Sequence, residues 1–260
     1  MARRMIKDPR MQLTAFQDRS INTLTVRLLL VTAVFLVVGS SVNAWPPQPA
    51  HEGCLHKNPR LAYSAFDTPL QQEDGWVAIK TDEGLLFVWN VRGLYFTLSI
   101  KGKEIKPLDD PDHIFFNVDG RTLQIQLASI NNFAPDAKEK KLDDKSILAA
   151  HRDWESKFVE ELIHSKLKVQ TFNVRLSSGS DASMWQFDMP EGMDSEAKKQ
   201  LYLTVVNKDY VLMLNSEATT AISDDDGRKF LLDTIATLKN SPTPIDVKKL
   251  SETIRKGVGP

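Results

Sequence analysis

Alternating apolar and polar positions predict β-strands through the first half of the globular region. Leu123, Ile125 and Leu127 alternate with polar residues, a pattern typical of an antiparallel sheet with one buried and one solvated face. The pair Asp119-Gly120 tolerates positive φ angles and predicts a tight hairpin turn. Five strand-like runs occupy residues 76–80, 85–90, 94–100, 113–118 and 122–130.

The second half of the chain repeats the strand pattern after residue 167. Four runs occupy residues 168–176, 184–189, 201–206 and 210–214, and Asn207-Lys208-Asp209 predicts a second hairpin between the last two. In the first of these runs we expect one alternating set of side chains to be buried: Gln170, Phe172, Val174 and Leu176.

Helical periodicity predicts two main helices. In the first, Asp143 or Asp144 is the expected N-cap. One stripe is expected to face the core: Ile147, His151, Trp154, Phe158 and Leu162. The opposite side is expected to face solvent: Arg152, Asp153, Glu155, Lys157 and Glu160. In the second helix, Ser223 and Asp226 resemble a capping box, and Pro242 lies beyond its end. Its expected buried stripe is Phe230, Leu231, Thr234, Ile235 and Leu238.

This element order predicts an α+β fold, a largely antiparallel sheet with the two helices packed on it. We expect a single globular domain at residues 76–240. A proline-rich lead-in at 45–75 precedes it, and a polar C-terminal tail at 241–260, with space for one short helix, follows. The tryptophans of the domain are expected to fill its core: Trp76, Trp89, Trp154 and Trp185.

Near its end the chain has a strand pair, QLYLTVV and DYVLMLN, a short acidic link and the helix FLLDTIATL. With the earlier long helix after a hairpin, this order over residues 76–240 resembles the Mog1/PsbP-like α/β/α sandwich family. The resemblance implies a non-enzymatic binding or assembly-accessory domain, and it transfers no functional residue.

Residues 1–44 predict a targeting segment. Arg27 precedes the apolar run LLLVTAVFLVV at 28–38, and Val42 and Ala44 have the small-residue spacing that a signal peptidase requires. Cleavage between Ala44 and Trp45 would release an exported protein, either periplasmic or secreted, or one in an organelle lumen.

An uncleaved signal anchor is the alternative for this segment. A generous count from Leu28 to Trp45 gives 18 residues, close to the length that spans a bilayer. In that case residues 28–44 would be the membrane contact, with Trp45 at the membrane boundary.

Charge is divided unevenly between the targeting segment and the remainder. Residues 1–44 hold six of the 33 basic and two of the 34 acidic residues, which leaves 27 basic and 32 acidic residues, a net charge of −5, after residue 44. A mildly acidic body has no electrostatic footprint for phosphate backbones, so we expect no nucleic-acid partner. The expected partner is a protein of the cell envelope.

One cluster has residue types that bind zinc or copper: His51, Cys54 and His56. It lies in the lead-in, where a solvated polar loop is the competing interpretation. Cys54 is the only cysteine, so no intrachain disulfide can form.

The other histidines and the acidic clusters are expected to be structural. His151 lies on the apolar stripe and is expected to pack in the core, His113 begins a strand, and His164 ends a helix. Asp224-Asp225-Asp226 is expected to favour a helix start rather than to bind calcium. Asp109-Asp110-Pro111-Asp112 is expected to form an exposed acidic turn.

The sequence contains none of the common nucleophile-elbow, phosphate-loop or zinc-protease motifs. Ser178 and Ser183 have no recognisable base beside them in the sequence. We therefore expect a non-catalytic binding domain without a cofactor. A hydrolase with a site built from distant loops, or a metal-handling protein using the His51–Cys54–His56 cluster, remains the alternative.

Overall fold

The structure, a computed structural model, describes residues 75–91, 93–108, 110, 113–191 and 196–256 of the 260. The targeting segment 1–44 and nearly all of the lead-in lie outside the described residues. The expectations for Ala44, Trp45, His51, Cys54 and His56 therefore remain predictions. Among the described residues, no helix is both long and apolar enough to cross a bilayer.

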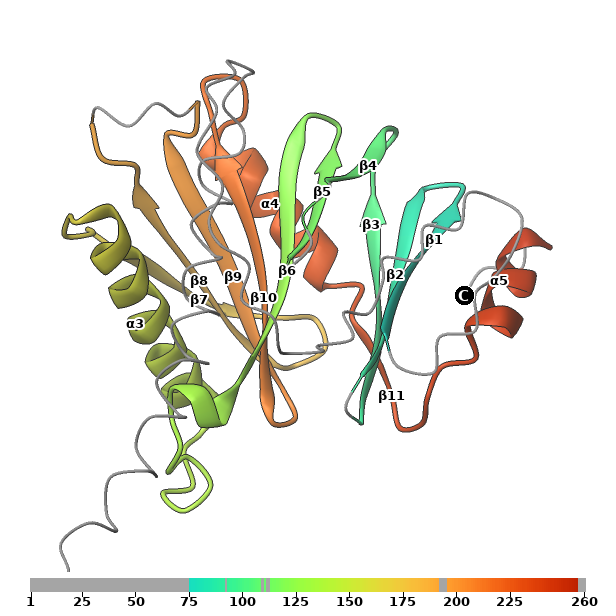
Figure 1. The fold of residues 1–260 in the computed structure, drawn as a ribbon, viewed down its shortest axis with the longest axis horizontal. Helices are drawn as coiled ribbons and strands as arrows, with labels where there is room; N and C mark the ends of the chain where they lie inside the picture. Colours follow the sequence, from blue (N-terminus) through green and yellow to red (C-terminus); the bar gives the residue numbers. More distant parts are fainter. Residues whose placement is uncertain (1–74, 92, 109, 111–112, 192–195, 257–260) are drawn as a thin grey trace, which may run out of the picture.

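The described strands form two antiparallel sheets (Figure 1). The four-stranded sheet has the order β1-β2-β3-β11, with bounds β1 Gly75–Thr81, β2 Gly84–Val91, β3 Leu94–Lys101 and β11 Lys239–Ser241. The seven-stranded sheet has the order β4-β5-β6-β10-β9-β8-β7, with bounds β4 Ile105–Leu108, β5 Ile114–Val118, β6 Arg121–Ser129, β7 Gln170–Arg175, β8 Asp181–Asp188, β9 Lys199–Asn207 and β10 Tyr210–Ala218. The predicted α+β class with antiparallel pairing is confirmed, although the strands divide between two sheets instead of forming one.

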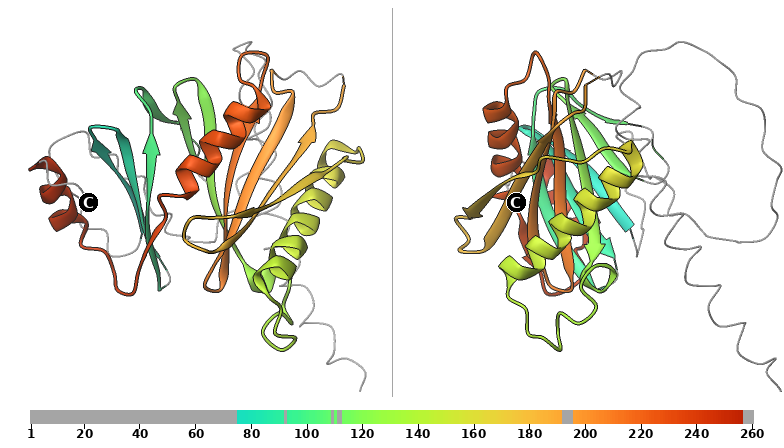
Figure 2. Two further views of the ribbon diagram at one scale, coloured as in Figure 1. Left: turned by 180° about the vertical axis from the view of Figure 1, so that it is seen from behind. Right: turned by 90° about the vertical axis from the view of Figure 1, so that its left-hand side faces the viewer.

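Two main helices lie on opposite faces of the seven-stranded sheet (Figure 2). α3, Asp144–Ile163, contacts β8 and β9 on one face, and α4, Asp224–Ile235, contacts β9, β10 and β3 on the other. A short 3₁₀ helix, Ile130–Asn132, follows β6. The short helix α5, Val247–Arg255, lies beside β1.

Most of the apolar core lies between the two sheets and α4. Most of the strands contribute alternate residues to it, as in the β9 pair Leu201 and Leu203, while Tyr202 between them points to the α3 side. Trp185 is fully buried under α3, Trp76 and Trp89 pack against the main core, and Trp154 is half-buried.

The local signals at turns and helix starts agree with the structure. Asp119 and Gly120 have φ angles of 51° and 83° between β5 and β6. The Asp143 side chain accepts a hydrogen bond from Ser146 N at 2.9 Å, and Ser223 Oγ accepts one from Asp226 N at 3.1 Å. These contacts satisfy N–H groups that the first turn of a helix leaves without partners.

Glu155 is the largest departure from the predicted burial, because it is fully buried instead of facing solvent. It lies four residues after His151 and three before Phe158, so helical geometry places it between two buried positions. Leu148 and Val159 are buried as well and widen the stripe on this side.

Phe172 departs in the opposite direction, since 39% of it is exposed although we expected it to be buried. β7 is the last strand of its sheet, and only Val174 and Leu176 of the expected set reach the main core. Phe172 precedes both of these residues in the chain, at a position that the core does not cover.

Asp110 is a third departure, because it is buried rather than part of an exposed turn. Its Oδ1 accepts hydrogen bonds from His113 N at 2.8 Å and pairs with His113 Nδ1 at 2.9 Å. Asp110 therefore orders the start of β5. The neighbouring residues 109, 111 and 112 lie outside the described part of the chain.

Candidate functional site

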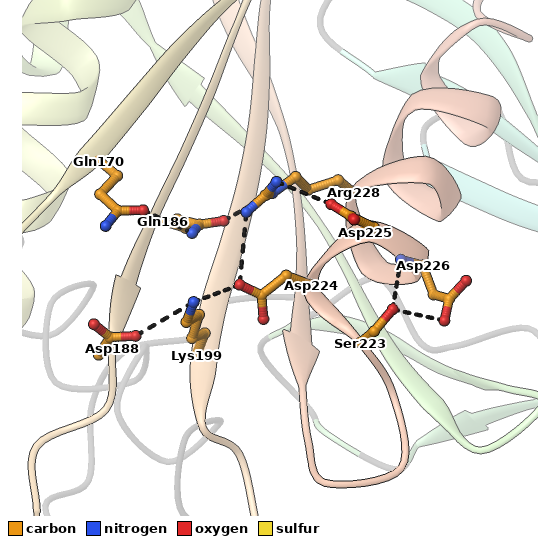
Figure 3. A network of polar contacts seen from close by, with 9 residues as sticks. All are labelled: Gln170, Gln186, Asp188, Lys199, Ser223, Asp224, Asp225, Asp226 and Arg228. Carbon is orange, nitrogen blue, oxygen red and sulfur yellow. Dashed lines mark hydrogen bonds and ion pairs between the residues drawn. The ribbon is translucent and has the colours of Figure 1, made fainter.

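A network of charged side chains joins the N-terminal turn of α4 to β8 and β9 (Figure 3). Lys199 on β9 donates to the carboxylate of Asp224 and lies 3.6 Å from Asp188 on β8. The hydrogen bond to Asp224 raises the pKa of Lys199 above its ordinary value. Lys199 is therefore fixed as a cation between two carboxylates.

Arg228 is held by acceptors on all three of its guanidinium nitrogens. Nε donates to Gln186 Oε1 at 3.0 Å and Nη1 to Asp225 Oδ1 at 3.1 Å, while Nη2 lies 3.6 Å from Asp224 Oδ2. Gln186 in turn donates to Gln170 on β7 at 3.0 Å (Figure 3). The network therefore fixes the guanidinium over the outer strands of the sheet.

The fixed guanidinium lies over the exposed ring of Phe172. Arg228 Cζ is 4.9 Å from the ring centroid, within the range of a cation–π contact. Phe172 is one of only two large apolar side chains that are exposed among the described residues. The pair makes a patch with an apolar face and a charged, planar rim, which we call the Phe172–Arg228 surface.

Beside this surface runs β7, the outermost of the described strands on its side of the seven-stranded sheet. Among the described strands, β7 pairs only with β8, and five of its six residues are exposed. On the α3 side of the strand, Thr171 Oγ1 accepts a hydrogen bond from Arg152 Nη1 at 3.2 Å. The edge therefore offers backbone groups next to an aromatic side chain.

A second group of polar residues is buried between α3 and the sheet. Among the described residues, neither carboxylate oxygen of Glu155 has a hydrogen-bond partner, and the same holds for His151 Nδ1 and Trp185 Nε1. Burial raises the pKa of Glu155 to about 7 and lowers the pKa of His151 to about 4. Burial, with a smaller effect of the Glu155 charge, raises the pKa of Tyr202. His151 is packed in the interior, as predicted.

The two serine candidates lie in unrelated places. Ser178 Oγ is 3.3 Å from Ser180 Oγ in the exposed turn after β7. Ser183 is buried in β8 and lines a hollow of about 40 Å³ between α3 and the sheet, together with Arg152 and Asp181. This hollow has room for only a few water molecules.

The acidic run at the start of α4 has the structural role that was expected of it. Asp224 and Asp225 bind Lys199 and Arg228, while the Asp226 carboxylate accepts a hydrogen bond from the hydroxyl of the N-cap residue Ser223. Among the described residues, no group of three or more His, Cys, Asp or Glu side chains is placed to hold a metal ion.

The sequence pattern indicated that Ser223 and Asp226 lie at a helix start. It did not indicate that Arg228 and Phe172 form a surface together. The spacing of Arg228, three residues after Asp225 and four after Asp224, was a usable signal for ion pairs along a helix. The contact with Phe172 joins residues 56 positions apart, and no local pattern reports it.

No protein-family model matches the chain, and a search of curated proteins finds no match. Among solved structures, the chain is similar to the solution structure of cyanobacterial PsbP (CyanoP) from Synechocystis sp. PCC 6803. The sequence identity is 12% and the TM-score is 0.37, and the match covers 67% of this chain and 98% of that chain. This similarity brings no functional residue to this chain.

Proposed function

We propose that the chain is an exported, non-catalytic binding domain that recognises a protein partner through the Phe172–Arg228 surface. The observation that carries this proposal is the exposed Phe172 ring beneath a guanidinium held by three acceptors. Aromatic residues and arginine are enriched at the centres of protein interfaces, where a few such residues supply most of the binding energy.

Preorganisation makes this surface suited to binding. A free arginine loses rotamer freedom when a partner orders it, whereas the Arg228 side chain is already ordered by Gln186, Asp224 and Asp225. The exposed face of Phe172 adds apolar area at little entropic cost, because the Arg228 guanidinium already restricts its ring. A protein surface with an apolar centre is the matching partner chemistry.

The sequence supports the remaining parts of the proposal. The basic and apolar segment before residue 44 supports export, and the net charge of −5 after it favours a protein over a nucleic acid as partner. The envelope of the cell is the expected location of both.

Export predicts a new N-terminus at Trp45. The full-length gene is expressed in its host, the cells are fractionated, and the mature N-terminus is sequenced. We expect a chain that begins at Trp45 in the soluble exported fraction. An intact N-terminus in the membrane fraction would instead identify residues 28–44 as a signal anchor, and a cytoplasmic chain would contradict export.

Replacing Phe172 with alanine is expected to abolish partner recovery with little loss of stability, because the ring is exposed. Tagged wild-type protein and the variants Phe172→Ala, Arg228→Ala and Lys229→Ala are purified from the host envelope, and co-purifying proteins are quantified. Lys229 is the matched control, since it is an exposed cation on the same helix that forms an ion pair with Asp233.

We expect a partner that wild type and Lys229→Ala retain and that Phe172→Ala reduces at least tenfold, the loss that corresponds to one interface hot spot. Equal recovery by all four proteins, or no specific partner with any of them, would contradict the proposal.

A further inference from the structure

A hydrogen bond just beyond the end of β7 shows to which side of the strand each of its backbone N–H and C=O groups points. Leu176 N donates to Ser180 O at 3.0 Å, so the Leu176 backbone points toward β8. In an antiparallel pair, the N–H and C=O of a residue point to the same side, and successive residues point to opposite sides. The backbone groups of Thr171, Asn173 and Arg175 therefore point to the free edge.

The two edges of the seven-stranded sheet are protected differently. β4, at one edge, has four residues and includes Pro107, which cannot donate to a further strand. β7, at the other edge, has six residues without a proline, and Arg175 is the only charged one. Proteins normally protect long edge strands with prolines, charges or bulges, so an open edge of this kind is suited to pairing.

The sequence of β7 is compatible with pairing to itself. When two copies run antiparallel about a two-fold axis at Asn173, Phe172 lies opposite the second copy's Val174, and Thr171 lies opposite the second copy's Arg175. Aromatic and β-branched residues are a favourable cross-strand pair, and no like charges face each other. The register also covers the part of Phe172 that is exposed in one copy.

We propose that β7 pairs with β7 of a second copy of this chain across a two-fold axis at Asn173, which joins the two seven-stranded sheets. The inference rests on the proposed function in one respect, since it identifies the partner at the Phe172–Arg228 surface as a second copy. The interface is isologous, with the same patch used on both sides.

In this register, Asn173 is the one residue of β7 that lies opposite the same residue of the second copy. Opposing residues in a hydrogen-bonded antiparallel pair have Cα atoms about 5.5 Å apart, which is within the range that a disulfide spans. The Arg175 residues of the two copies would lie four positions apart along the paired strands, a distance of about 13 Å, which is too far for a disulfide.

The test is cysteine cross-linking of the full chain in its host envelope. Asn173→Cys and Arg175→Cys are each made together with Cys54→Ser, and mild oxidation is followed by non-reducing electrophoresis. Both positions are exposed, so both variants are expected to fold. We expect at least tenfold more disulfide-linked dimer from Asn173→Cys than from Arg175→Cys.

Equal cross-linking at the two positions, or none at either, would overturn the second copy as the partner. Loss of partner recovery in Phe172→Ala without a cross-link at position 173 would leave the proposed binding function in place and reject only this inference. A cross-link at 173 together with recovery of an untagged second copy of this chain by the tagged wild type would support both.

Discussion

Replacing Glu155 with methionine is expected to raise the free energy of unfolding at pH 8 by about 3 kcal/mol. Glu155 is fully buried, and neither of its oxygens has a hydrogen-bond partner in the part of the chain that the structure describes. Burial raises its pKa from 4.5 to about 7, so the folded protein at pH 8 holds a buried carboxylate that the unfolded chain exposes to water. Methionine fills the same space without a charge.

The expected pH dependence follows from the sign of this shift. The folded pKa of Glu155 lies above its unfolded value, so its cost is absent below about pH 4.5, grows up to about pH 7 and is constant above. His151 has the opposite sign, because burial lowers its pKa from 6.5 to about 4, and its cost grows as the pH falls through that range. Between pH 4.5 and 6.5 the two slopes offset each other.

Single substitutions should therefore reveal two pH dependences of stability that offset each other in the wild-type protein. As the pH rises from 4.5 to 6.5, the free energy of unfolding of Glu155→Met relative to wild type is expected to increase by about 1.4 kcal/mol for each pH unit. The free energy of unfolding of His151→Leu relative to wild type is expected to decrease at a similar rate. Denaturant unfolding at several pH values measures both. Glu161→Met, at an exposed position of the same helix, is the control, and a Glu155→Met curve parallel to wild type would contradict the prediction.

Replacing Gly84 with alanine is expected to destabilise the four-stranded sheet by on the order of 3 kcal/mol. Gly84 has a φ of 146°, which L-residues rarely adopt, and a Cβ there would lie 2.2 Å from the backbone oxygen of Ile100. Both atoms belong to the β2–β3 pair, whose backbones must separate to admit the methyl group. The thermal midpoint is expected to fall by several degrees.

Gly93→Ala separates the effect of crowding from the effect of backbone angle. Gly93 has a φ of 72°, and a Cβ there would have no atom of the described residues within 4 Å. We expect a loss of about 1 kcal/mol, the cost of the left-handed conformation alone. Losses of equal size at Gly84 and Gly93 would show that contact with Ile100 does not determine the outcome.

Elements that depend on short-range chemistry were predictable from the sequence. The Asp119-Gly120 turn, the Asp143 cap and the Ser223 cap each act within three residues, and each is present. β4 escaped prediction because Ile105–Leu108 contains a lysine and a proline and no clear alternation. The division into two sheets could not be predicted either, since β11 and β3 pair across more than 130 residues.

The candidate site was harder to predict than the fold, because exposure is set by distant elements. Phe172 has the sequence pattern of a buried strand residue, and its exposure follows only from the position of β7 at the sheet edge. Glu155 has the composition of a solvated position, and its burial follows from the way α3 lies on Trp185 and Tyr202. The charge and periodicity of one segment do not indicate which distant segments will cover it.

The pairing of β11 with β3 has a consequence for the order of folding. The Thr237 hydroxyl contacts the Ser99 backbone, and the Asn90 side chain bonds both backbone groups of Ile245, 155 positions later. Contacts between such distant segments form slowly, because a long loop must close first. In a chain that emerges N-terminus first, β1, β2 and β3 are complete long before their last partner arrives. Until residues 239–241 are free, β3 has an open edge, and this interval is when the newly made chain most needs protection from proteases and aggregation.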